Sequence, residues 1–189
     1  MPTGAVAVLV ALVLVAAAAR ADQQEAAPAP SGERGGSAVK LGRTGLALTL
    51  PRRWKERVVP GDDPPPGVVR RAFIREGLRN GAAKPPALML IAEPVPPSTD
   101  IVKYSAIKRE GAPPHKVLNL FSHLDGTITL KYAIGYRIRG DGPAARSEVH
   151  LVHALAGGYG FVILLESQQE DHEAIKGEIA GILRSLRAR

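Results

Sequence analysis

The stretch TITLKYAIGYRIRG (127–140) decides the fold, because its side chains alternate in kind along the chain. One set is apolar and comprises Ile128, Leu130, Tyr132, Ile134, Tyr136 and Ile138. The residues between them are polar, small or basic. Successive side chains of a strand point to opposite faces of its sheet, so this period of two predicts one long β-strand over 127–139 with a dry and a wet face.

Three more strands are predicted around this one. KVLNLFSHL (116–124) precedes it across Asp125-Gly126, and Asp-Gly between apolar runs is a strong hairpin signal because both residues tolerate positive φ. After it, RGDGPAA leads into a strand over 144–155, and AGG leads into a strand over 159–167. We therefore expect a four-strand antiparallel meander. Its last strand contains FVILLE, which is apolar on both faces and is typical of a central strand.

The period changes to that of a helix after this meander. Apolar residues then recur at helical spacing, at Ile175, Ile179, Ile182, Leu183 and Leu186. Ser167 with Glu170 forms a possible capping box, and Asp171 is an alternative cap. A shorter helix is predicted over 101–109, after the capping residues of PPSTD.

Short strands are also predicted over 46–50, 67–75 and 87–92, from their apolar and β-branched residues between turn signals. The element order predicts an α+β fold. It consists of an antiparallel sheet with a four-strand C-terminal meander, packed under a C-terminal amphipathic helix, and one short additional helix.

The N-terminal region predicts export. Ala5–Ala19 is an uncharged run, and Ala19-Arg20-Ala21 fits a small-x-small cleavage pattern, so residues 1–21 are interpreted as a signal peptide. A retained anchor is the alternative. Residues 22–38 lack large apolar side chains, which predicts a flexible low-complexity linker before a single domain over 39–189. We expect a periplasmic or secreted protein and, with no cysteine in the chain, no disulfide.

The 189-residue chain is basic, with a formal net charge of +7. An exported basic protein can meet an acidic protein or an anionic envelope component, including a membrane surface in peripheral contact. The excess charge can also serve only to keep the surface solvated. The basic runs lack the interleaved aromatic residues of single-strand binders, so no nucleic-acid partner is expected.

A family resemblance appears at the two ends of the domain. TGLALTLPRRWKE (44–56) and GYGFVILLESQQEDHEAIKGEIAGILRSLR (158–187), with the meander between them, resemble the PsbP-like fold. Extrinsic photosystem proteins, the Ran-binding Mog protein and DcrB-like bacterial envelope proteins share that fold. The resemblance covers about residues 39–186 and implies a non-enzymatic binding or assembly factor. It carries no catalytic motif, and no family site matches this sequence residue by residue.

Two histidines in the predicted meander raise the hypothesis of a metal site. His150 and His153 lie three apart on a predicted strand and therefore point to opposite faces, so they cannot chelate one ion. His153 is expected to be partly buried and hydrogen-bonded. His150 shares a face with Glu148, which leaves a surface metal or charge site open, although zinc sites need three or four converging ligands. We predict no metal site and no cofactor.

No nucleophile motif is present, so no catalytic residue is predicted and the chain is expected not to be an enzyme. Two groups remain as candidate binding residues. Lys131, Arg137 and Arg139 share the wet side of the long strand and form a candidate partner-binding face. Trp54, the only tryptophan and expected to plug the core, and Glu166 mark a candidate cleft beside the last helix.

These observations predict an exported, non-enzymatic binding or assembly module of the cell envelope. Its expected partner is an unknown protein or anionic component, and the domain is expected to be a monomer. The alternative is a periplasmic small-molecule or metal carrier. A hydrolase is a third reading, which a convergent Ser/His/Asp cluster would support.

Overall fold

The computed structural model describes residues 36–58, 64–78, 84–141 and 146–188. The predicted signal peptide and most of the predicted linker lie outside these residues. The strands are β1 (Gly36–Lys40), β2 (Ala47–Pro51), β3 (Trp54–Arg57), β4 (Val69–Arg75), β5 (Ala87–Pro94), β6 (His115–Ser122), β7 (Ala133–Gly140), β8 (Ser147–Ala156) and β9 (Tyr159–Gln168). The helices are the 3₁₀ turn η1 (Gly42–Thr44), α1 (Ile101–Glu110) and α2 (Gln169–Ser185).

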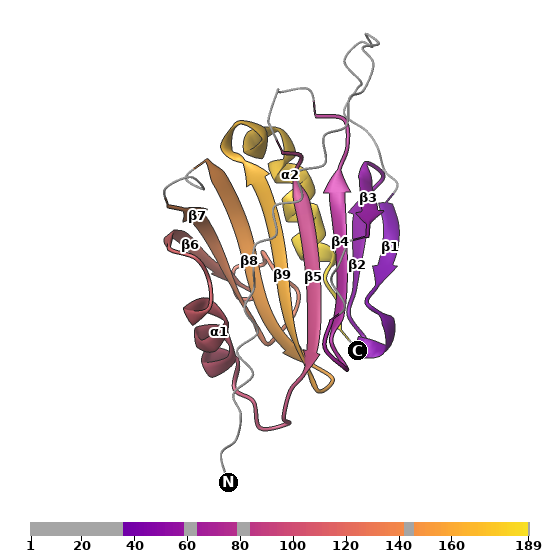
Figure 1. Cartoon of the computed structure of the whole chain (residues 1–189), viewed down its shortest axis with the longest axis vertical. Helices are drawn as coiled ribbons and strands as arrows, with labels where there is room; N and C mark the ends of the chain where they lie inside the picture. The colour runs from indigo at the N-terminus through magenta and orange to yellow at the C-terminus, as the bar shows by residue number, and fades with distance from the viewer. Residues whose placement is uncertain (1–35, 59–63, 79–83, 142–145, 189) are drawn as a thin grey trace.

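Seven strands form one antiparallel sheet in the order β3-β4-β5-β9-β8-β7-β6, and β1 pairs with β2 beside it. Helix α2 lies along one face of the large sheet and α1 lies against the other face (Figure 1). The α+β class, the antiparallel sheet and the packed C-terminal helix are confirmed. Strands β1 and β3 were not predicted, and β1 begins before the predicted domain start at residue 39.

The four-strand meander is also confirmed, since β6, β7, β8 and β9 are consecutive neighbours in the sheet. Gly157 and Gly158 connect β8 to β9 with φ angles of 57° and 79°, so this hairpin needs the left-handed backbone that glycine adopts without strain. Strand β9 lies between β8 and β5. Its central position agrees with the apolar character of both its faces.

The predicted strand over 127–139 is shorter than expected, because β7 begins only at Ala133. Asp125 accepts hydrogen bonds from the backbone N–H groups of Ser122 and Thr127, at 3.0 and 2.9 Å, and Gly126 has a φ of 76°. The Asp-Gly turn is therefore part of a wider connection over 123–132 and not a tight hairpin.

This connection also changes which face the apolar residues occupy. Ile128 and Leu130 lie in the core with Ala133, on the side of α2. Ile134, Tyr136 and Ile138 lie in the separate apolar cluster under α1. The prediction that all these apolar residues share one dry face was wrong. The bend at residues 131–132 breaks the period of two, and both faces of β7 are partly covered.

The predicted apolar stripe of the last helix is confirmed. All five of its apolar residues are buried against the sheet: Ile175, Ile179, Ile182, Leu183 and Leu186. The capping box is not formed, since Ser167 belongs to β9 and the N-cap is Gln168 without a side-chain hydrogen bond. Helix α1 begins as predicted, and the Asp100 carboxylate accepts hydrogen bonds from the backbone N–H groups of Val102 and Lys103.

A candidate binding pocket between helix α2 and the meander

The site begins with the register of three neighbouring strands. Arg137 of β7 lies between Asn119 of β6 and His150 of β8, and all three line the side that α2 covers. In the next pair toward the strand ends, Arg139 lies opposite Glu148. This register brings two arginines of one strand to a carboxylate of its neighbour, because cross-strand side chains on one face are in contact range.

Glu148 is the centre of an ion cluster. Its side chain is almost fully buried and accepts hydrogen bonds from Arg137 Nη2 at 2.6 Å, Arg137 Nε at 2.8 Å and Arg139 Nη2 at 2.8 Å. Burial by itself raises the pKa of Glu148, but the hydrogen bonds from Arg139 and Arg137 outweigh it and hold the pKa below its ordinary value. Glu148 is therefore ionised at neutral pH, and the arginines satisfy its charge.

Two imidazoles lie beside this cluster. His150 and His172 of α2 stack with ring centroids 5.3 Å apart and planes within 7°, and His172 Nε2 is 3.7 Å from Glu148 Oε2. Burial is the main cause that lowers the pKa of His150 to about 4, and it also lowers the pKa of His172. His150 is therefore a neutral ring at pH 7, and His172 is biased toward its neutral form.

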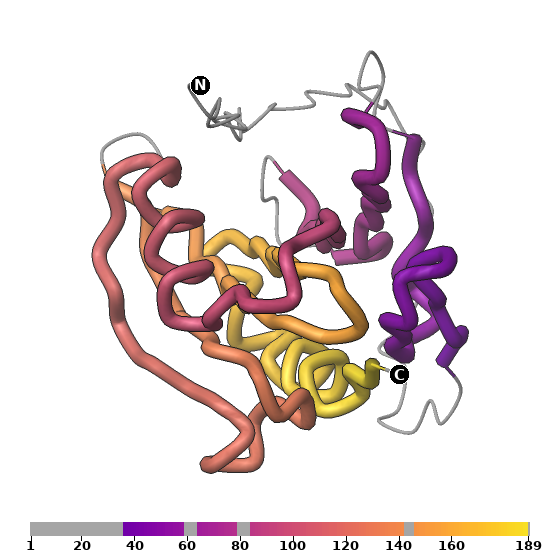
Figure 2. The backbone as a smooth tube through the Cα atoms, turned by 90° about the horizontal axis from the view of Figure 1, so that it is seen from below, coloured from indigo at the N-terminus to yellow at the C-terminus, as the bar shows by residue number. Residues whose placement is uncertain are grey.

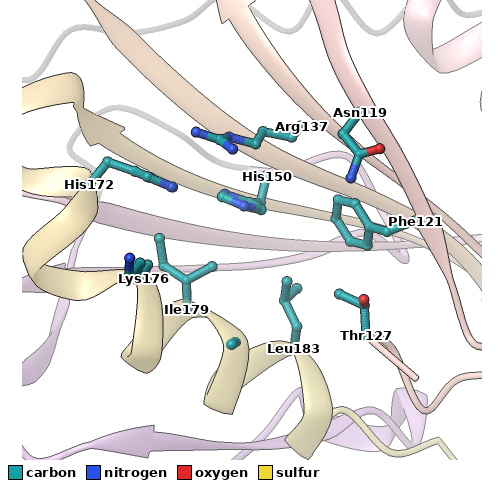
Figure 3. Close-up of a pocket in the computed structure, with 10 residues that line it drawn as sticks. Asn119, Phe121, Thr127, Arg137, His150, His172, Lys176, Ile179 and Leu183 are labelled. Atoms are coloured by element: carbon teal, nitrogen blue, oxygen red, sulfur yellow. The ribbon is translucent and has the colours of Figure 1, made fainter. Parts of the chain in front are cut away.

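A pocket of about 200 Å³ opens next to these rings. Figure 3 shows the side chains of the sheet on one side of it and those of α2 on the other. Its lining consists of Asn119, Phe121, Thr127, Arg137, His150, His172, Lys176, Ile179, Ala180 and Leu183. The lining thus joins two cationic side chains, two imidazoles and an apolar floor.

Phe121 contributes to this floor because the residue opposite it on β7 is glycine. A Cβ atom at Gly135 would lie 2.2 Å from Cε2 of the Phe121 ring, which is closer than real Cβ contacts. The missing side chain lets the ring lie across β7. Phe121 also contacts the His150 ring at a centroid distance of 5.9 Å, so the aromatic floor continues into the imidazole pair.

The opposite face of the same strands carries a different polar cluster. Ser105 of α1 forms hydrogen bonds of 2.8 Å with Tyr136 Oη and with His153 Nδ1. Ser105 and His153 are each only 1% exposed. Burial is the main cause that lowers the pKa of His153 to about 4. This confirms that His150 and His153 point to opposite faces and that His153 is hydrogen-bonded. His153 is also more completely buried than expected.

Ser105 and His153 are as close as a nucleophile and its general base, so they are the residues that test the hypothesis of a hydrolase. Both are sealed from solvent, and no carboxylate of the described residues is hydrogen-bonded to His153. The geometry therefore offers a substrate no access to Ser105. Within the same part of the chain, no three metal-ligating side chains converge on one point.

The predicted basic row on β7 is not formed. Lys131 is exposed but precedes the strand, and its ammonium lies 5.6 Å from the Tyr132 ring centroid. Arg137 and Arg139 do share a face, but it is the face of α2, where Glu148 binds both. The strand bend and the opposing carboxylate explain the difference. A binding role for the three residues stays a prediction.

Trp54 and Glu166 do not line one cleft. Trp54 is buried on the side of α2 and donates from Nε1 to Glu178 Oε2 at 2.8 Å, so it plugs the core as its sequence context predicted. Glu166 alternates with Leu165 on β9 and shares a face with Leu164, which packs in the cluster under α1. The sheet itself separates the two residues.

The sequence left a charge site at Glu148 and His150 open, but it did not identify Arg137 and Arg139 as the partners of Glu148, and it gave His172 no role. The spacing of Arg137 with Arg139, and of Glu148 with His150, gave each pair a common face. Their meeting depends on the strand register, which such spacing leaves open. His172 had no signal, since it reaches the site only through the placement of α2.

No family profile and no curated protein matches the sequence. Solved structures match in fold. PsbP of Synechocystis sp. PCC 6803 (CyanoP) has a TM-score of 0.54 at 14% identity, covering 85% of this chain and 98% of that one. The Ran-binding protein Mog1p of Saccharomyces cerevisiae has a TM-score of 0.50 at 9% identity, covering 82% and 95%.

A third similar structure is LpqN of Mycobacterium tuberculosis, a protein involved in cell envelope biogenesis, with a TM-score of 0.50 at 12% identity, covering 80% of this chain and 89% of that one. These three proteins represent the groups that the sequence resemblance named. Identities this low establish the architecture and not a shared activity. In the part of the chain that the structure describes, no helix is long and apolar enough to cross a membrane. The chain has the PsbP-like fold.

Proposed function

We propose that this protein is an exported, non-enzymatic binding or assembly module of the cell envelope, and that a partner protein docks along strand β6. The similar structures support a binding role, since one is of a Ran-binding protein and another is of a protein involved in cell envelope biogenesis. The sealed position of Ser105 and His153 supports a role without catalysis.

The observation that carries the proposal is a set of exposed apolar side chains on edge strand β6 and in the connection that follows it. Strand order ends at β6, so one side of β6 has no strand neighbour among the described residues. Leu120 on this strand is 60% exposed and Leu124 just after it is 85% exposed. Val117 and Tyr132 are exposed as well, and we refer to these four residues as the β6 edge surface. Exposed apolar side chains that gather in one place mark interaction sites.

The geometry of β6 favours an extended segment as the occupant. An open strand edge offers unpaired backbone groups to another strand, and such pairing is a common mode of peptide recognition. A β-bulge lies between Val117 and Asn119, which leaves 119–122 as the regular stretch where a partner strand can pair.

The charges around this edge select the chemistry of the partner. Lys116 on β6 and Lys131 in the following connection are exposed, and Arg137 and Arg139 remain about one third exposed despite their bonds to Glu148. A partner segment with acidic side chains complements these cations, which raises the association rate and the specificity. We therefore assign the β6 edge surface to an extended acidic segment of a partner protein.

Photo-crosslinking in the source cells tests this function. A crosslinking amino acid at Leu120 or Leu124 of the full chain should give discrete protein adducts, and the same group at Lys55 on the opposite edge strand β3 should give few. The double change Lys116→Glu with Lys131→Glu should reduce the adducts, as should high salt, because exposed charges are screened over about 10 Å at 0.1 M.

Equal adducts from Lys55, or adducts that the charge reversal leaves unchanged, would place the partner elsewhere. Adducts to lipid alone would replace the protein partner with a membrane surface and would overturn the proposal.

A further inference from the structure

The geometry points to a second, separate site: the pocket under α2 binds a small organic monocarboxylate with a flat apolar body about the size of benzoate. This inference does not depend on the β6 edge surface. It rests on the cations, the floor and the volume of the pocket.

Two cations approach the pocket from opposite walls. Arg137 enters from the sheet and Lys176 enters from α2, and no aspartate or glutamate is among the lining residues. Glu148 accepts hydrogen bonds from Nε and Nη2 of Arg137, which fixes the guanidinium in place and leaves Nη1 without a hydrogen-bond partner among the described residues. The arrangement is a rigid cation on one side and an adjustable cation on the other.

Lys176 can release its present partner to meet a ligand. Its ammonium is 2.6 Å from Glu173, but both side chains are largely exposed, at 65% and 72%. An exposed ion pair of this kind contributes little net stability, so an exchange of Glu173 for a ligand carboxylate costs little. A buried pair would not permit this exchange.

The floor of the pocket selects an apolar body. Phe121, Ile179 and Leu183 are buried side chains that line it, and the neutral His150 ring continues the flat surface. Aromatic rings prefer offset or edge contacts with one another, which a flat ligand can make with Phe121 and His150. A fully hydrated anion such as phosphate gains nothing from these contacts.

The volume limits the size of the ligand. An apolar cavity of about 150 Å³ is known to hold benzene, and this pocket measures about 200 Å³. A single ring with one carboxylate therefore fits, and a larger acyl chain or a nucleotide does not. Small ligands of this size bind with modest affinity, so we expect a Kd of about 1 mM or tighter.

Calorimetric titration of the full chain tests the inference with three probes. Benzoate should bind. Benzyl alcohol, which lacks the charge, and inorganic phosphate, which lacks the ring, should each bind at least about tenfold more weakly. Equal binding of benzyl alcohol would remove the role of the cations, and equal binding of phosphate would remove the role of the floor. Either result would overturn the assignment.

Two variants place the ligand in this pocket. Lys176→Gln should weaken benzoate binding about two- to fivefold, the range of an exposed ion pair. Ala180→Leu, which fills the pocket and keeps both cations, should abolish measurable binding. The matched controls are Lys103→Gln and Ala106→Leu, which make the same changes at exposed positions of α1 on the other face. Benzoate affinity that survives Ala180→Leu unchanged would overturn the inference even if wild-type binding is strong.

Discussion

Strands β7 and β8 carry two polar clusters on opposite faces, built from residues that are close neighbours in the sequence. Tyr136 and His153 join Ser105 in a hydrogen-bonded group that α1 seals from solvent. Arg137 and His150 join Glu148 and the rim of an open pocket under α2. The difference shows that alternation in a strand can give one pair of strands both a structural network and a candidate site.

The two faces differ because of how their helices cover them. Helix α1 lies directly over β7 and β8, so its Ser105 reaches the polar atoms there. Helix α2 packs its stripe against the sheet and also contacts β2, away from the free edge of the meander (Figure 2). The α2-facing side chains of β6, β7 and β8 are therefore only partly covered, which leaves the pocket.

The largest effect should come from the packing of α2. Ile182 is fully buried, and Ile182→Ala should lower the free energy of unfolding by about 2–5 kcal/mol, because it removes apolar contacts and leaves a cavity. Ile107 of α1 is 65% exposed, and Ile107→Ala should change it by less than about 0.5 kcal/mol. Urea unfolding of both variants measures this contrast. A small loss for Ile182→Ala would mean that α2 does not close the core.

A second effect depends on pH and involves one histidine of each cluster. The pKa values of His153 and His150 are lowered to about 4, below the ordinary value of 6.5, so the unfolded chain binds protons that the folded chain does not. The contribution of these two histidines to the free energy of unfolding should therefore be fully present above pH 6.5. It should be lost as the pH decreases toward 4, by up to about 1.4 kcal/mol per pH unit for each histidine. Both faces contribute to this slope.

The sealed and the open histidine should differ at pH 7.5, where neither is protonated. His153→Gln should lower the free energy of unfolding by about 1–3 kcal/mol, since it disturbs the buried hydrogen bond with Ser105. His150→Gln should cost less, because His150 lies at the rim of the pocket. Urea unfolding at pH 7.5 and pH 5.5 measures both quantities. A stability independent of pH over this interval, or a larger loss for His150→Gln, would break the comparison.

Much of this comparison could be predicted from local sequence. The spacing of His150 and His153 placed them on opposite faces, and the periodic residues from Ile175 to Leu186 identified the buried side of the last helix. Such patterns follow from the backbone geometry of one element, so the spacing of residues in the sequence is enough to predict them.

The remainder depends on contacts between elements. The bend before Ala133 moved Ile128 and Leu130 to the face opposite Ile134, because an irregular connection shifts the strand period without changing the alternation of residue types. The pairing of Arg139 with Glu148 required the register of two strands, and His172 required the placement of a helix. Neither is encoded in a short window of sequence.

The most direct test of an open face and a sealed face is the NMR spectrum of the histidine rings during a benzoate titration of the full chain. The chain has five histidines, so each ring is followed in one experiment. Signals of His150 and His172 should move along a common saturation curve, because these rings line the pocket. The signal of His153 should stay in place, because α1 and the sheet exclude the ligand from it. A shift of His153 equal to that of His150, or stationary signals of His150 and His172 at saturating benzoate, would contradict the account.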